Sequence, residues 1–384
     1  MSSRHSGRVP RVRLIAAVGA AVAGLGLATP QAGAAIASSD TTGYAASAKS
    51  AATKALASDA GIGAAAAERR IEAEGAQAAL AGRLVDRLGQ NAAGAYFDSA
   101  TGDLVVNVVT AKAAETVRAA AARARVVDHS TAELGAITTE MNGHAGVPNT
   151  SWGTDTAANE IVLTLGKGVS SAEAAELLAV AREHRDAVRV ERTSDRFRRY
   201  DSGGYPIFTG GGSRCSLGFN VTGGFMLTAG HCTEGFPNWF NFQDRFIGPT
   251  VNSSFPGNDY GRIRNDGGIA QPGNVYLWNN SFQDITFSGN SVLGQSICKS
   301  GSTTGLTCGS VVAKNVTVNY GGGDIVSGLD QSNACASPGD SGGSWFNGTK
   351  AIGLTSGGNL ACPGAQTFFQ PVQEALNAFG VSVY

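Results

Sequence analysis

The sequence predicts two folding units of different class, an α+β unit followed by an all-β unit. Residues 35–200 are rich in Ala, Glu and Arg, contain no cysteine, and show helical periodicity in two segments. From about residue 201 the pattern changes to short alternating strands separated by glycine-rich turns. Many short strands with such turns are typical of a β-sandwich or a β-barrel.

Composition and charge narrow the class of protein further. The chain has 384 residues, a formal net charge of −1, 53 glycines and only 15% charged residues. The near-neutral charge argues against nucleic acid or an anionic membrane as the main partner. The glycine content and the low charge favour a loop-rich secreted protein over a helical cytosolic one.

The N-terminus has the pattern of a secretory signal over residues 1–34. Four arginines before position 14 form a basic region, and the apolar stretch over residues 14–28 is too short for a comfortable membrane span. Ala32-Gly33-Ala34 then supplies an A-x-A cleavage site. We therefore expect a secreted, extracellular protein, with a single membrane anchor as the less favoured alternative.

Helices and strands mix in the unit over residues 35–200. Helices are predicted at residues 64–83 and 170–185, the second opening with a capping box from Ser170 to Glu173. A β-hairpin and a third strand are predicted at residues 94–97, 103–109 and 161–165. The basic, polar segment 192–200 is expected to be the exposed junction with the second unit.

The unit over residues 201–384 contains many predicted strands and one predicted helix. The clearest strands are at residues 217–221, 225–228, 311–313, 316–319 and 351–355. The helix spans residues 371–379, with Pro371 at an early helical position and Gly380 as its stop.

All six cysteines lie in this second unit, which indicates disulfides and an oxidising destination. Six cysteines allow 15 pairings. We favour sequential pairing because each closed loop is then short, which gives Cys215–Cys232, Cys298–Cys308 and Cys335–Cys362. Zinc binding or buried free thiols are the alternatives, and the lack of any C-x2-C pair disfavours zinc.

The run Gly339-Asp340-Ser341-Gly342-Gly343 has the pattern of a nucleophilic serine on a glycine-rich turn. A free hydroxyl is a poor nucleophile at neutral pH, so Ser341 needs a base to accept its proton. The run also matches the nucleophile elbow of α/β-hydrolases, but there the histidine follows the serine. Residues 342–384 contain no histidine, so that class is excluded. Because His231 lies upstream of Ser341, the order that remains is His, Asp, Ser, which is that of chymotrypsin-like proteases.

This order requires an acid between His231 and Ser341, and Asp259 is the best candidate. It follows a small polar turn and precedes residues 262–264, which alternate like a strand. Other aspartates between His231 and Ser341 are more typical of solvated loop carboxylates. They are Asp244, Asp266, Asp284, Asp324 and Asp330.

Taken together, these motifs resemble streptogrisin-type serine proteases, of the α-lytic-protease branch of the chymotrypsin-like fold. The resemblance covers nearly all of residues 205–384 and is carried by residues 215–221, 227–232, 254–261, 301–305, 316–324, 338–343 and 351–384. It implies two perpendicular six-stranded antiparallel β-barrels with the active site between them, and a C-terminal helix. Residues 35–200 resemble, more weakly, the family's pro-region, which implies a folding catalyst and temporary inhibitor removed by self-cleavage.

The resemblance also implies a role for each site residue. His231 is the expected general base and acid, Asp259 orients it, and Ser341 attacks the peptide carbonyl. The backbone N–H groups of Gly339 and Ser341 are the expected oxyanion hole, at a few kcal/mol per donor. Ser356 is expected to hydrogen-bond Asp259, and with the next two glycines to pair with the substrate backbone as an added strand.

The expected primary specificity pocket carries no charge. In the family its walls are the positions held here by Ala334, Ala336, Pro338, Thr355, Ser356, Gly357 and Gly358. No aspartate stands at its base, and position 355 has neither the histidine of glutamate-specific relatives nor the methionine that narrows the α-lytic pocket. We expect a preference for Phe, Tyr or Leu at P1, which would allow self-cleavage after Tyr200.

One position departs from the family pattern. Relatives pair an arginine with the aspartate before the nucleophile, whereas here Lys299 holds that position, so an Asp340–Lys299 pair is expected. Lysine lacks the bidentate fork, which makes the pair looser. The Cys298–Cys308 bridge resembles the α-lytic branch, whereas the tail and pocket resemble the streptogrisin A/B subgroup.

The sequence therefore predicts a secreted, monomeric serine endopeptidase made as a preproenzyme. Its expected parts are a signal peptide (1–34), a pro-region (35–200) and a mature protease (201–384). The expected partners are protein and peptide substrates and the enzyme's own pro-region, with no metal, cofactor, nucleic acid or, after signal removal, membrane. A catalytically inactive peptide-binding homologue and an esterase with the same triad are the alternatives, and the complete triad disfavours the first.

Overall fold

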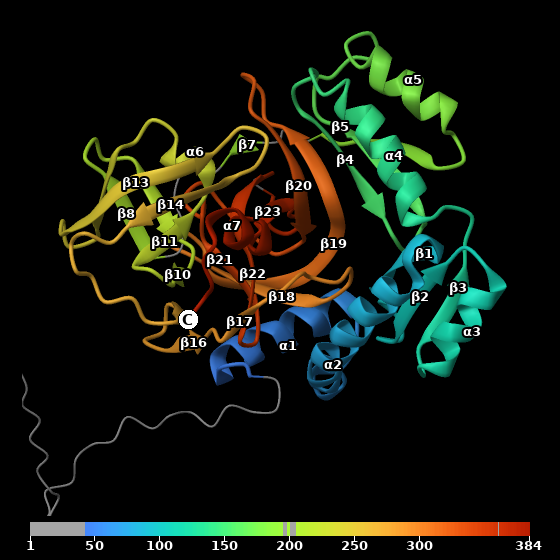
Figure 1. The fold of residues 1–384 in the computed structure, drawn as a ribbon, viewed down its shortest axis with the longest axis horizontal. Coiled ribbons are helices and arrows are strands. Elements are labelled where there is room, and N and C mark those ends of the chain that lie inside the picture. Colours follow the sequence, from blue (N-terminus) through green and yellow to red (C-terminus); the bar gives the residue numbers. More distant parts are fainter. Residues whose placement is uncertain (1–42, 195–197, 200–204, 360) are drawn as a thin grey trace, which may run out of the picture. The chain divides into compact units, whose positions relative to one another are not determined.

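The computed structural model describes residues 43–194, 198–199, 205–359 and 361–384 (Figure 1). The predicted signal peptide and the bond after Tyr200 lie outside these described residues. Among the described helices, none combines the length and the apolar character that a membrane span requires.

The first part of the expected pro-region contains three helices and a small sheet. Its elements are α1 (Ala46–Ala60), α2 (Ala64–Leu88), β1 (Ala92–Phe97), β2 (Leu104–Val108), α3 (Ala111–Ala119) and β3 (Arg123–Val126). The predicted hairpin is present, because β1 and β2 pair antiparallel with Phe97 opposite Leu104. Helix α2 begins at the predicted residue and continues five residues past the predicted end, so that Leu84 and Leu88 join the core beside the sheet.

The second part of the expected pro-region is a smaller α+β unit. It consists of α4 (Thr131–Asn142), β4 (Thr150–Asp155), β5 (Glu160–Leu165), α5 (Ala175–Glu183) and β6 (Val188–Arg192). The prediction of a helix from Ser170 was wrong about its start. Ser170 and Glu173 do make both capping-box hydrogen bonds, but in an exposed turn. The α-helix begins at Ala175, where Leu177 and Val180 provide a buried face.

The first β-barrel unit of the C-terminal half is a curved sheet of seven strands. They are β8 (Tyr205–Thr209), β9 (Arg214–Leu217), β10 (Asn220–Val221), β11 (Phe225–Thr228), β12 (Asn238–Asn241), β13 (Phe246–Ser254) and β14 (Tyr260–Arg264). The hydrogen-bonded order is β10-β11-β14-β13-β12-β8-β9. Six strands were expected, and the additional strand is the two-residue β10. Alternating residues such as Ile207, Met226 and Ile263 fill the core.

The second unit is a closed six-stranded barrel. Its strands are β18 (Ser296–Gly301), β19 (Gly305–Asn319), β20 (Ile325–Ser332), β21 (Ser344–Asn347), β22 (Lys350–Gly358) and β23 (Thr367–Pro371). The order runs β18-β21-β22-β23-β20-β19, and pairing of β19 with β18 closes the ring. The predicted C-terminal helix follows as α7 (Val372–Phe379), which ends at Gly380 in the left-handed conformation.

The sheet of the second barrel continues into the expected pro-region. Strand β4 pairs antiparallel with β19, with Trp152 opposite Thr317, and β5 and β6 extend the sheet beyond it (Figure 1). Helix α1 also contacts this barrel, since Ala48 and Ala52 share a buried cluster with Phe346. These contacts join segments that lie more than 150 residues apart in the chain.

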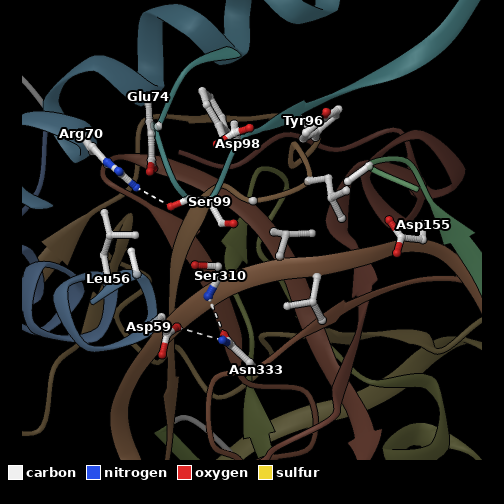
Figure 2. Close-up of a pocket in the computed structure, with 18 residues that line it drawn as sticks. Leu56, Asp59, Arg70, Glu74, Tyr96, Asp98, Ser99, Asp155, Ser310 and Asn333 are labelled. Carbon is white, nitrogen blue, oxygen red and sulfur yellow. Dashed lines mark hydrogen bonds between the residues drawn. The ribbon is translucent and has the colours of Figure 1, made fainter. Parts of the chain in front are cut away.

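A buried carboxylate marks the contact between α2 and β18. Glu74 is only 4% exposed and accepts hydrogen bonds from both the backbone N–H and the hydroxyl of Ser296, each at 3.0 Å. Burial raises the pKa of Glu74 to about 7, against the opposing effects of the Ser296 hydrogen bonds, Arg70 and Lys350. Glu74 lines a cavity of about 500 Å³, and two other lining residues are joined by a hydrogen bond, which Asn333 donates to Asp59 at 2.8 Å (Figure 2). No member of the expected triad lines this cavity.

Glu74 predicts that the stability of the uncleaved chain depends on pH. Its pKa of about 7 in the folded chain exceeds the usual 4.5, so folding takes up a proton between these values. Protonated Glu74 therefore contributes its full stability below about pH 4.5, and this contribution is lost as the pH rises from about 4.5 through about 7. We expect Glu74→Gln, in the Ser341→Ala chain, to raise the melting temperature at pH 8 relative to its parent and to lose that advantage at pH 4.5.

The matched control is Glu72→Gln, an exposed glutamate on the same helix that pairs with Lys49. Melting temperatures of the three chains between pH 4.5 and 8 test the prediction. Parallel curves for the parent and the Glu74→Gln chain would show that the buried carboxylate carries no proton linkage.

Candidate active site

His231 lies on a short helical turn that the sequence patterns did not predict, α6 (Gly230–Thr233). The turn begins directly after β11, where the extended Ala229 redirects the chain. Only glycine fits at position 230, because a Cβ there would overlap the carbonyl oxygen of Ser254. The Cys215–Cys232 disulfide links this turn to β9. These constraints fix the backbone at the histidine.

The His231 ring bridges Asp259 and Ser341. Its Nδ1 lies 2.9 Å from Asp259 Oδ2, and its Nε2 lies 2.9 Å from Ser341 Oγ. The side chains of His231 and Asp259 are 2% and 0% exposed, so little water competes for these contacts. An imidazole with a carboxylate on one nitrogen and a hydroxyl on the other is arranged to accept the hydroxyl proton.

Several donors hold the carboxylate of Asp259. The backbone N–H of His231 donates to Oδ1 at 2.9 Å, and Ser356 Oγ donates to Oδ2 at 2.6 Å. Among the rival acids, Asp330 pairs with Lys314 and Asp266 with Arg264. The structure therefore brings Asp259, and not those two, to the histidine.

The turn at Ser341 depends on its glycines. Gly339 and Gly342 have φ values of +119° and +79°, and a Cβ would overlap Thr303 Oγ1 at the first and Thr228 Oγ1 at the second. The Ser341 carbonyl accepts from the Ser216 N–H at 2.9 Å, which ties the turn to the first barrel. Within the part of the chain that the structure describes, the N–H groups of Gly339 and Ser341 have no hydrogen-bond partner.

Lys299 and Asp340 form a fully buried ion pair behind this turn. Their Nζ and Oδ2 atoms are 3.2 Å apart, and both side chains are 0% exposed. Burial lowers the pKa of Lys299, and Asp340 opposes this effect. Asp340 also accepts from the Ser337 N–H at 2.9 Å and from Thr304 Oγ1 at 2.6 Å. The aspartate is thus held on several sides at the residue next to Ser341.

Residues expected to form the specificity pocket lie around the end of β22. Thr355 is buried, and its hydroxyl accepts from Trp345 Nε1 at 3.0 Å and donates to the Gly343 carbonyl at 3.3 Å. Ala334 and Ala336 are buried on the neighbouring segment. The disulfides Cys335–Cys362 and Cys298–Cys308 close this region and the β18–β19 hairpin. The one proton of the Thr355 hydroxyl is therefore already donated within the protein.

A short strand from the expected junction lies against the same edge. Residues Arg198–Arg199, labelled β7, pair antiparallel with β22, so that Arg199 is opposite Gly357 and Arg198 opposite Gly358. Main-chain pairing of an extended segment with a sheet edge is a common mode of peptide recognition. The chain's own junction thus occupies the edge that was expected to pair with a substrate.

Sequence patterns did not indicate two further polar residues near the triad. Tyr320 OH lies 3.1 Å from Ser356 Oγ, and Gln370 Oε1 accepts from the Asp259 N–H at 2.8 Å. Gln370 is 111 positions from Asp259, and an isolated glutamine in a strand carries no motif. The described residues contain no cluster of three or more His, Cys, Asp or Glu side chains that could hold a metal ion.

Fold and site together define the class of protein as a chymotrypsin-like serine protease made with a pro-region. Residues 205–379 match the family model described as Trypsin. Residues 65–127 match Alpha-lytic protease pro N-terminal, and residues 129–184 match Alpha-lytic protease prodomain.

Comparison with curated proteins identifies the family. Streptogrisin-D of Streptomyces griseus is 45% identical over 313 residues, which cover 80% of this chain and 80% of the relative. Streptogrisin-A of the same organism is 49% identical over 62% of this chain and 80% of its own length. Glutamyl endopeptidase 2, also from Streptomyces griseus, is 47% identical over 47% of this chain and 98% of its own length. The chain belongs to the streptogrisin family of chymotrypsin-like serine endopeptidases, as the sequence motifs predicted.

Proposed function

We propose that this serine endopeptidase works through a His231–Asp259–Ser341 triad and prefers large hydrophobic P1 residues. The observation that carries the proposal is the His231 ring, which lies 2.9 Å from both Asp259 Oδ2 and Ser341 Oγ. No other histidine occurs in residues 201–384, so no second base is available near the serine.

The geometry supports an acyl-enzyme route. His231 Nε2 takes the proton of Ser341 as its Oγ bonds to the scissile carbonyl carbon, and then returns that proton to the leaving amine. Water repeats the sequence to release the acyl group. Asp259 keeps the Nδ1 proton on the imidazole and stabilises its charged form. The N–H groups of Gly339 and Ser341 donate hydrogen bonds to the carbonyl oxygen and stabilise the negative charge that develops on it.

The lining of the pocket supports an apolar P1 residue. Ala334, Ala336 and two glycines contribute no charge, and the Thr355 hydroxyl is already satisfied by Trp345 and Gly343. A charged P1 side chain would be buried without a partner, which is costly. The similarity to a glutamyl endopeptidase makes glutamate the main rival, but position 355 holds threonine where glutamate-specific relatives have histidine.

We further propose that the chain processes itself. The parts are a signal peptide over residues 1–34, a pro-region over 35–200, and a mature enzyme from about 201 that is secreted and acts as a monomer. The pairing of Arg198–Arg199 with β22 supports self-processing, because the expected junction then lies along the strand that is proposed to pair with substrate. Hydrophobic Tyr200 is then the P1 residue of the cleaved bond.

The test is a panel of tetrapeptide anilides that differ only at P1, with Phe, Leu, Ala, Glu or Lys. We expect kcat/KM for Phe and Leu to exceed that for Ala by about a hundredfold, as expected for extra buried methylenes, and Glu and Lys to be cleaved more slowly still. A preference for Glu or Ala would overturn the pocket assignment and keep the triad. Cleavage of a plain ester without cleavage of any peptide would favour the esterase alternative.

A further inference from the structure

We propose that Gln370 is a positioning residue for the catalytic aspartate, and that Glu374 fixes the orientation of its amide. The inference rests on the proposed triad and extends it to two side chains that touch neither the substrate nor the reacting atoms. The two side chains form a hydrogen-bonded relay, which runs from Glu374 on helix α7 through Gln370 on β23 to the backbone N–H of Asp259.

The amide of Gln370 has a defined hydrogen-bond partner on each of its two polar atoms. Gln370 lies on β23 with 0% exposure, and its Oε1 accepts from the backbone N–H of Asp259 at 2.8 Å. Its Nε2 donates at 2.7 Å to Oε2 of Glu374, which lies in the first turn of α7. An N–H can only donate and an ionised carboxylate can only accept, so the two partners demand the same orientation of the amide. Glu374 therefore prevents the amide from turning over and presenting Nε2 to the Asp259 N–H.

The contact matters because Asp259 lies between two strands. It falls after β13, which ends at Ser254, and just before β14, which begins at Tyr260. Asp259 is 0% exposed, so without Gln370 its N–H would be a buried donor with no partner. The side chain of Asp259 is fixed by His231 and Ser356, but only while the main chain that carries it stays in place.

The contact also crosses from one barrel to the other. Asp259 belongs to the first barrel, whereas Gln370 and Glu374 belong to the second barrel and its helix. A neighbouring main-chain bond, from the Gly257 N–H to the Ile325 carbonyl at 2.8 Å, crosses at the same place. The second barrel thus supplies both the nucleophile and a support for the aspartate that orients the base.

Glu374 is the solvent-accessible end of this hydrogen-bonded relay. Partial burial of its carboxyl group raises the pKa of Glu374, the hydrogen bond from Gln370 opposes this effect, and nearby Asp330 adds to it. Because Glu374 is exposed at the surface of α7, its replacement is compatible with folding even where replacement of Gln370 is not.

The primary variant is Gln370→Met, which keeps the length of the side chain and removes the acceptor. With Asp259 released, we expect kcat to fall about 10- to 100-fold with KM unchanged, a loss typical of small misplacements of catalytic groups. The acid limb of the pH–rate profile should move to lower pH, because a displaced carboxylate stabilises protonated His231 less. Glu374→Met should give a smaller change of the same kind, and Glu374→Gln, which retains an acceptor, should restore most of the activity.

Gln373→Met is the matched control, since Gln373 lies on the same helix and contacts Ser288 and Asn377 instead. All rates are measured on mature enzyme and divided by the concentration of active sites from a burst titration. An unchanged kcat per active site and an unchanged acid limb in both Gln370→Met and Glu374→Met would overturn the inference. So would a loss in Gln370→Met that disappears after division by active sites, because that result reports only unfolding. If Ser341→Ala kept full activity, the proposed triad itself would fail, which is a separate result.

Discussion

Replacing Ser341 with alanine is expected to lower kcat on a tetrapeptide anilide by about four to six orders of magnitude. The change removes the Oγ that lies 2.9 Å from His231 Nε2 and leaves the buried His231–Asp259 contact intact. The remaining rate would come from binding and from the N–H groups at Gly339 and Ser341. If the enzyme processes itself, the variant should also accumulate as the uncleaved chain, which its intact mass would show.

Ser288→Ala is the matched control, because the Ser288 hydroxyl donates to Gln373 Oε1 at 3.0 Å and to no member of the triad. It should process and cleave like the wild type. Adding wild-type enzyme to the uncleaved Ser341→Ala chain should release a fragment that begins near Asp201. Near-normal turnover by Ser341→Ala would remove this serine as the nucleophile.

Replacing Lys299 with methionine is expected to lower the free energy of unfolding of the mature enzyme by about 3–5 kcal/mol. The variant leaves the Asp340 carboxylate buried without its cation, although backbone and Thr304 donors still contact it. Activity should fall as well, since Asp340 precedes Ser341 and accepts from Ser337 on the other side of the turn. Denaturant unfolding of enzyme inactivated by a sulfonyl fluoride, which avoids self-digestion, measures the stability term.

Lys314→Met is the comparison variant, because it separates the effect of burying the lysine from the effect of the distance between the paired charges. The Lys314–Asp330 pair is shorter, at 2.6 Å, but the lysine side chain is 30% exposed. Asp330 itself is only 4% exposed, but Ser291 still donates to it and solvent reaches the lysine, so we expect a smaller loss of stability than for Lys299→Met. Equal effects of the two substitutions, or an unchanged melting temperature and activity for Lys299→Met, would contradict a structural role for the buried pair.

The sequence was informative wherever chemistry restricts the choice of residue. The absence of histidine after Ser341 was enough to select the chymotrypsin-like class, which the family matches confirm. Short alternating strands indicated an all-β unit, and the structure closes six of them into a barrel. Glycines 339 and 342 could be anticipated because a turn that presents adjacent N–H groups requires backbone angles that side chains resist.

Other features could not be predicted because they depend on contacts between distant segments. Trp152 pairs with Thr317 across two strands, and no local sequence pattern specifies which strand pairs with which. Gln370 belongs to no motif, and its proposed role follows only from the buried Asp259 N–H that donates to it. The late start of α5 shows the same limit, since capping chemistry at Ser170 marks a turn while packing of Leu177 decides where the helix begins.

The division of the proposed triad between the two barrels has a consequence for the timing of activity. His231 and Asp259 come from the first barrel, and Ser341 comes from the second. A chain in which either barrel has formed alone therefore holds a base without a nucleophile, or a nucleophile without a base. Such a species has no means of cutting its neighbours, however concentrated it becomes. With the proposed triad, hydrolysis therefore requires both barrels to be folded and in contact, because separation of the barrels takes Ser341 away from His231.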